Sequence, residues 1–160
     1  MEKQLILLRH AEAVEKLAGE TDQSRSLSRK GLNDAHHVGI LLNKLELNID
    51  CIYTSPAERA QTTAQYISGP LAIDTSLIFE DDSLYLAPMG VLLKFVNEMP
   101  NEYNTVIIVG HNPNLSYFTE YITNHSVTLD TAAFARIRFA FDNWHMVTQG
   151  SGELLEVVNI

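Results

Sequence analysis

Apolar residues along the chain fall into short unbroken runs separated by longer segments with a helical period. Unbroken runs cover residues 5–8 and 106–109, and a similar apolar segment covers residues 49–54. Such runs are typical of strands that are buried on both faces of a sheet. Between them, apolar positions recur every three or four residues, which predicts helices. The predicted helices cover about residues 28–45, 56–67 and 88–99, and another begins at Asn112-Pro113.

The last third of the chain has a different pattern. Residues 133–141 alternate between two faces, one of them apolar, which predicts a half-buried strand. Strands near residues 144–148 and 154–158 would add antiparallel neighbours, whereas residues 68–88 are irregular and acidic. Alternation of strands and helices in the first two-thirds predicts βα units. The predicted fold is therefore α/β: a three-layer αβα sandwich with a mostly parallel central sheet and antiparallel strands near the C-terminus.

Length and charge narrow the class of protein. The chain has 160 residues, of which 46 % are apolar, so we expect a single domain over residues 1–160. Its 20 acidic and 11 basic residues give a formal net charge of −9. Such an acidic surface argues against general binding to nucleic acid or to an anionic membrane. The single cysteine, Cys51, and the absence of a long apolar run predict a cytoplasmic protein.

Histidine and arginine residues follow three of the predicted strands. The first strand ends at Arg9 and His10, the second at Ser55 with Arg59 four residues later, and the third just before His111. Ligands of open α/β sheets bind beyond the carboxyl ends of the strands. The topology therefore brings two imidazoles and two guanidiniums to one edge of the predicted sheet.

These residue types suit a phosphoryl group. Arginine presents a planar fork of donors that matches phosphate oxygens, and phosphoryl transfer depends mainly on positioning and charge stabilisation. A neutral imidazole can act as a nucleophile. Repulsion from Arg9 and Arg59 would favour neutral His10, and a backbone carbonyl at its other ring nitrogen would fix the tautomer.

Four segments of the chain resemble the histidine phosphatase superfamily, also called phosphoglycerate-mutase-like. They are LLRHAEA at residues 7–13, RSLSRKG at 25–31, SPAERAQTTA at 55–64 and VGHNP at 109–113. They occur in the family order. The short chain, without a large insertion, is most similar to the compact SixA-type phosphohistidine phosphatases.

The resemblance implies a role for each matching residue. His10 would be phosphorylated and then freed by water, without a metal ion or another cofactor. Arg9 and Arg59 would bind the phosphoryl oxygens, and His111 would be a further donor to them. Arg25 would be an additional phosphate contact.

The chain departs from larger family members at the acid that protonates the leaving group. The candidates Glu80, Asp81 and Asp82 lie outside any matching motif. A protonated imidazole leaves readily without such an acid, so the expected substrate is phosphohistidine on a partner protein, such as a phosphocarrier or phosphotransfer domain. Phosphate or another oxyanion would occupy the same site.

Two other functions remain open from the sequence. One is a small-metabolite phosphatase or mutase of the same superfamily, of which a mutase would need a well-placed acid and a longer insertion that encloses the substrate. A non-catalytic phosphate-binding module would have no need of a nucleophile. We expect no metal site, because the adjacent His36 and His37 would point about 100° apart on a helix and no second pair has suitable spacing.

Overall fold

The computed structural model describes residues 1–160, and its centre is one mixed sheet of six strands with the order β3-β2-β4-β1-β5-β6. The strands are β1 (Lys3–Arg9), β2 (Cys51–Thr54), β3 (Ile78–Glu80), β4 (Thr105–Gly110), β5 (Phe134–Phe139) and β6 (Glu153–Val158). The helices are α1 (Arg29–Asn43), α2 (Glu58–Leu71), α3 (Met89–Asn97) and α4 (Asn114–Thr123). Strands β3, β2, β4 and β1 are parallel, and β5 and β6 pair antiparallel at one side. The predicted α/β fold class is confirmed.

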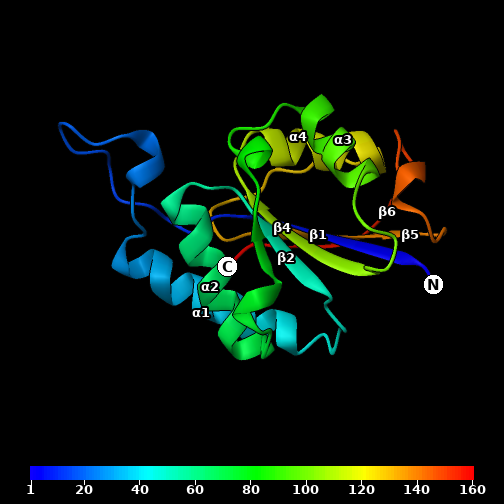
Figure 1. Ribbon diagram of the computed structural model, residues 1–160, viewed down its shortest axis with the longest axis horizontal. Helices are drawn as coiled ribbons and strands as arrows, with labels where there is room; N and C mark the ends of the chain where they lie inside the picture. Colours follow the sequence, from blue (N-terminus) through cyan, green and yellow to red (C-terminus); the bar gives the residue numbers. More distant parts are fainter.

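Both faces of the sheet are covered, which explains the unbroken apolar runs. In β1, Leu5 and Leu7 pack with α3 and α4, whereas Ile6 and Leu8 pack with α1 and α2, and all four side chains are fully buried. Figure 1 shows these two helix layers on opposite sides of the sheet. No helix is long and apolar enough to cross a membrane.

The parallel register places three strand ends at one edge. Arg9 of β1 is level with Gly110 of β4, and Thr54 of β2 is level with Val109. The backbone N–H of His10 then donates to the carbonyl of Gly110 at 3.0 Å. The residues that follow β1, β2 and β4 therefore begin side by side.

Two predicted elements differ from the structure. The strand expected at residues 144–148 is wrong: Trp144–Met146 is a short 3-10 helix, η4. Its buried Trp144 donates from the indole N–H to the carbonyl of Tyr103, and Asn143 caps the turn. The segment 68–88 is not wholly irregular, because it contains the three-residue edge strand β3.

Helix α2 also has different ends from those predicted. It begins at Glu58 rather than at Pro56, because Ser55 Oγ accepts from the N–H of Ala57 and bends the chain first. It continues past residue 67 and through Pro70 to Leu71.

Candidate active site

His10 lies directly after β1 and is 9 % exposed. Its Nδ1 is 2.7 Å from the carbonyl oxygen of Ala11. Because a carbonyl can only accept, Nδ1 carries the hydrogen, and the lone pair of the neutral ring is on Nε2. The side chain thus presents a nucleophilic nitrogen with a fixed tautomer.

Burial, together with the smaller effect of the positive charges of Arg59, Arg9 and Arg25, lowers the pKa of His10 to about 4, although the hydrogen bond with Ala11 acts in the opposite direction. The ring is therefore neutral near pH 7. Arginine repulsion was the only cause expected from the sequence, whereas removal of the ring from water is the larger effect.

Arg59 lies in the first turn of α2 and its side chain is 4 % exposed. Its Nε donates to Nε2 of His10 at 3.4 Å, and its Nη2 is 3.3 Å from Nδ1 of His111. One guanidinium therefore faces both imidazoles.

His111 follows β4 and is 4 % exposed. Its ring centroid is 5.2 Å from that of His10, and its Nε2 is 2.8 Å from Ser55 Oγ. Burial lowers the pKa of His111 to about 3, with smaller contributions from His10 and Arg59. The Nε2 atom of His111 is thus occupied by Ser55, and Nδ1 is directed toward Arg59.

Arg9 has a buried donor without a partner. Its Nη1 donates to the carbonyl of Leu129 at 3.0 Å, but its buried Nε makes no hydrogen bond. An unpaired buried N–H is costly, so such groups are rare unless a ligand satisfies them. Arg9 also lines the cavity described below, so an oxyanion bound there is a candidate acceptor for this donor.

All five predicted site residues line one cavity of about 490 Å³. Arg9, His10, Arg59 and His111 come from the three strand ends, and Arg25 comes from the loop before α1. The structure thus brings the expected side chains together around a space large enough for a phosphoryl group and part of a substrate. The other lining residues are Glu12, Ala13, Asp22, Tyr85, Leu86, Asn112 and Thr131.

Three acidic residues proposed from the sequence as candidate acids are not in this cavity. Glu80 accepts from Gln61 on another surface, Asp81 caps the turn that begins at Asp82, and none of the three lines the site. The physical reason is that β3, which ends at Glu80, is an edge strand separated from β1 by β2 and β4.

Asp22, at the rim of the cavity, is an acidic residue of the site that was not predicted from the sequence. Asp22 forms ion pairs with Arg59 at 3.0 Å and with Arg25 at 3.3 Å, and it accepts a hydrogen bond from the hydroxyl of Tyr85. The Tyr85 hydrogen bond and the arginines lower the pKa of Asp22 to about 2. Asp22 is therefore an ionised acceptor rather than a proton donor.

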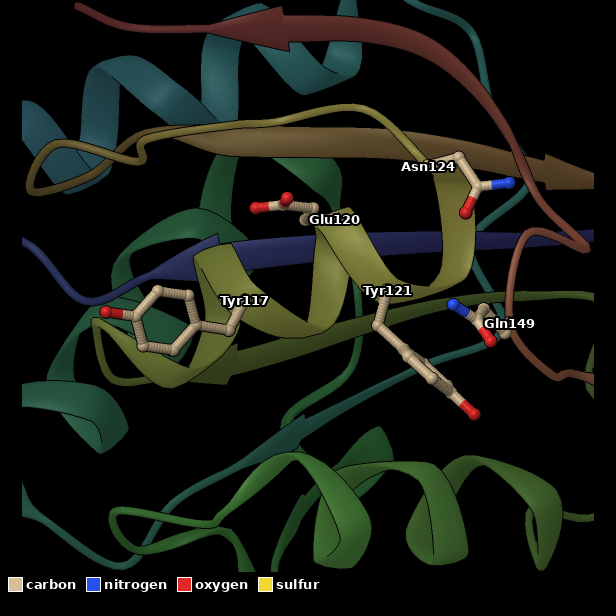
Figure 2. Close-up of a pocket in the computed structure, with 5 residues that line it drawn as sticks. All are labelled: Tyr117, Glu120, Tyr121, Asn124 and Gln149. Carbon is tan, nitrogen blue, oxygen red and sulfur yellow. The ribbon is translucent and has the colours of Figure 1, made fainter.

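A second open hollow, of about 400 Å³, lies over α4 (Figure 2). It is lined by Tyr117, Glu120, Tyr121, Asn124 and Gln149. No basic side chain is among them, so this hollow is not suited to a phosphoryl group. No group of three or more His, Cys, Asp or Glu side chains is arranged to hold a metal ion.

Comparisons with known proteins agree with this geometry. Residues 5–82 match the family model of the histidine phosphatase superfamily, branch 1. An uncharacterised protein of Picosynechococcus sp. is 28 % identical over 143 residues, which cover 84 % of each chain.

Solved structures share the fold over nearly the whole chain. A candidate phosphohistidine phosphatase SixA from Nakamurella multipartitia has a TM-score of 0.87 and 22 % identity, and the match covers 99 % of this chain and 96 % of that one. A protein histidine phosphatase SixA complexed with tungstate has a TM-score of 0.82 and 19 % identity, covering 97 % and 96 %. Residues 5–82 of this chain thus match the histidine phosphatase superfamily, and the chain as a whole shares the fold of these SixA structures.

Proposed function

We propose that this protein is a phosphatase that removes the phosphoryl group from phosphohistidine on a partner protein, through a phosphorylated His10. The observation that carries the proposal is the unprotonated Nε2 of neutral, buried His10, which lies in the same cavity as Arg9, Arg59 and His111. A module that only bound phosphate would need the arginines but not this nucleophile.

The first step transfers the phosphoryl group to the enzyme. His10 Nε2 attacks phosphorus, the P–N bond of the protonated substrate ring breaks, and the substrate histidine leaves as a neutral imidazole. The His10 ring becomes cationic, and Nδ1–H remains hydrogen-bonded to the carbonyl of Ala11. Arg9 and Arg59 stabilise the charge that spreads over the phosphoryl oxygens in the transition state.

The second step frees the enzyme. The oxygen of a water molecule bonds to phosphorus, the P–Nε2 bond breaks, and both water protons leave with the product as dihydrogen phosphate. His10 returns to its neutral form with Nδ1 protonated, so no net proton is left on the protein.

The leaving group supports phosphohistidine over an alkyl ester. An alkoxide needs a proton from a placed acid, but Asp22, the carboxylate paired with Arg59, is held ionised. A protonated imidazole needs no such help. The SixA proteins that share the fold are themselves named for phosphohistidine or protein histidine.

The experiment compares phosphate release from a phosphohistidine carrier domain with release from sugar and nucleotide monophosphates. We expect the carrier domain to be the better substrate and EDTA to leave the rate unchanged. His10→Ala should lose about 10³-fold or more, whereas His37→Ala on the exposed side of α1 should match wild type. Full activity of the His10 variant would rule out the nucleophile, and a preference for a metabolite ester would rule out the substrate class.

A further inference from the structure

The N–H groups of Arg59 are divided between two edges of its planar guanidinium. The Nε–Nη2 edge faces Nε2 of His10 at 3.4 Å and Nδ1 of His111 at 3.3 Å. The Nη1–Nη2 edge faces Asp22: Nη1 donates to its backbone carbonyl at 2.8 Å and Nη2 to Oδ2 at 3.0 Å. Because the group is rigid and planar, a partner that fixes one edge also fixes the direction of the other.

Asp22 is in turn held on both carboxylate oxygens. Oδ2 accepts from the hydroxyl of Tyr85, and Oδ1 accepts from Nη1 of Arg25 at 3.3 Å. The Asp22 side chain is 42 % exposed, whereas that of Arg59 is 4 % exposed. The Asp22 carboxylate thus lies at the rim of the cavity and contacts the buried guanidinium of Arg59.

The geometry points to Asp22 as the positioning residue for Arg59 in the phosphatase proposed above, on which this inference rests. Asp22 occupies the outer edge of the guanidinium and directs the inner Nε–H and Nη2–H to the space between the two imidazoles. An arriving phosphoryl group replaces the ring nitrogens as acceptor for that edge. Two parallel N–H donors then bind its oxygens, and Nε2 of His10 is released for attack.

The same contacts argue against Asp22 as an internal inhibitor. A carboxylate that mimicked the substrate would occupy the inner edge, between the histidines. Asp22 instead takes the edge that faces away from them, so it does not compete with the phosphoryl oxygens for the same N–H groups.

A pair of variants separates the hydrogen bond from the charge. Asp22→Asn and Asp22→Ala both remove the negative charge, but only Asn retains an oxygen that can accept from Arg59 Nη2. We expect Asn to stay within about threefold of wild-type kcat and Ala to lose about 10-fold to 100-fold, with KM changed less than kcat. Asp34→Ala, which removes a half-buried carboxylate paired with exposed Lys30 on α1, outside the cavity, should match wild type.

A further variant tests the hydrogen bond that the Tyr85 hydroxyl donates to Asp22. Tyr85→Phe removes the hydroxyl that donates to Oδ2 and should lower kcat severalfold while the ring remains. Circular dichroism verifies that each variant is folded under the assay conditions. Equal kcat for Asp22→Ala and Asp22→Asn would overturn the inference, and a gain of activity in both would show that the carboxylate obstructs the site.

Tungstate affinity, measured by calorimetry, separates this inference from the proposed function. If the inner edge of Arg59 is positioned by Asp22, Asp22→Ala binds tungstate severalfold more weakly than Asp22→Asn, whether or not wild type hydrolyses phosphohistidine. Equal affinities would refute the positioning role. Wild-type protein that binds tungstate but releases no phosphate would contradict the proposed function alone.

Discussion

At the scale of single residues, the two nitrogens of the His10 ring have separate tasks. Nδ1 is committed to the carbonyl of Ala11 at 2.7 Å, so only Nε2 is available to a substrate. Burial keeps the ring neutral, and the surrounding arginines add to that effect. The residue combines a fixed orientation with a lone pair that persists well below neutral pH.

Arg59 should be intolerant even of lysine. A lysine ammonium is a point charge that cannot span two imidazoles and a carboxylate at once. We therefore expect Arg59→Lys to lower kcat/KM by about 10²-fold or more, measured with the best phosphorylated substrate. Arg138 on β5 forms an exposed ion pair with Glu153 on β6, so Arg138→Lys should leave kcat/KM unchanged, and a similar loss there would indicate a general effect on folding.

The sequence could predict only part of this cluster. Arg9, His10 and His111 were predictable because each follows a buried strand, and strand ends of a parallel sheet converge. Asp22 and Tyr85 come from loops without a hydrophobic period, and only the folded path of those loops brings them to Arg59. Long-range hydrogen bonds of this kind leave no local signal in the chain.

At the scale of elements, the segment that follows His10 is packed directly on the start of α1. The N–H of Ser28 donates to the carbonyl of Glu12 at 2.9 Å, and Ser28 Oγ accepts from the N–H of Gly31. A Cβ added to Gly31 would lie 2.1 Å from that same Glu12 carbonyl oxygen. Glycine is required here because the backbones approach so closely.

Gly31→Ala should therefore destabilise the fold by about 1–3 kcal/mol, because backbone atoms must move apart to admit the methyl group. Urea denaturation monitored by circular dichroism measures the change. Gly90→Ala is the matched control, since a Cβ there meets nothing within 4 Å. Equal stability of the two variants would show that the contact between Gly31 and Glu12 is not tight.

The reliability of the predicted elements followed the strength of their periodic pattern. The strands around residues 5–8 and 106–109 were predicted because their apolar runs are buried on both faces. Strand β3 was missed because three residues are too few to show a periodic pattern. A strand was wrongly predicted around Trp144, whose buried ring belongs to a short 3-10 helix. Short elements take their conformation from tertiary contacts rather than from local pattern.

At the scale of the whole molecule, the two buried histidines of the site make the folded protein less stable at acidic pH. His10 and His111 are both buried, and their pKa values in the folded protein are about 4 and about 3, below the ordinary value of 6.5. At pH values between the unfolded pKa of 6.5 and these folded pKa values, the unfolded chain binds more protons than the folded protein. The free energy of unfolding therefore falls as the pH drops through this window.

We expect stability to decline between pH 7 and pH 5, with a slope at the acid end that approaches ~1.4 kcal/mol per pH unit for each histidine. Asp22 does not contribute in this range, because its pKa is lowered from 3.8 to about 2 and its effect begins at lower pH. Urea midpoints at several pH values provide the measurement. His111→Gln should flatten the decline, and an unchanged slope in that variant would contradict the assignment.

The most direct measurement follows the phosphoryl group itself. Protein mixed with a ³²P-labelled phosphohistidine domain is quenched in base within milliseconds, digested, and its labelled peptide sequenced by mass spectrometry. The account predicts a transient, acid-labile phosphate on His10 that forms and decays at rates compatible with turnover. Turnover with the label on another residue, or with no label on the protein at any time, would contradict it.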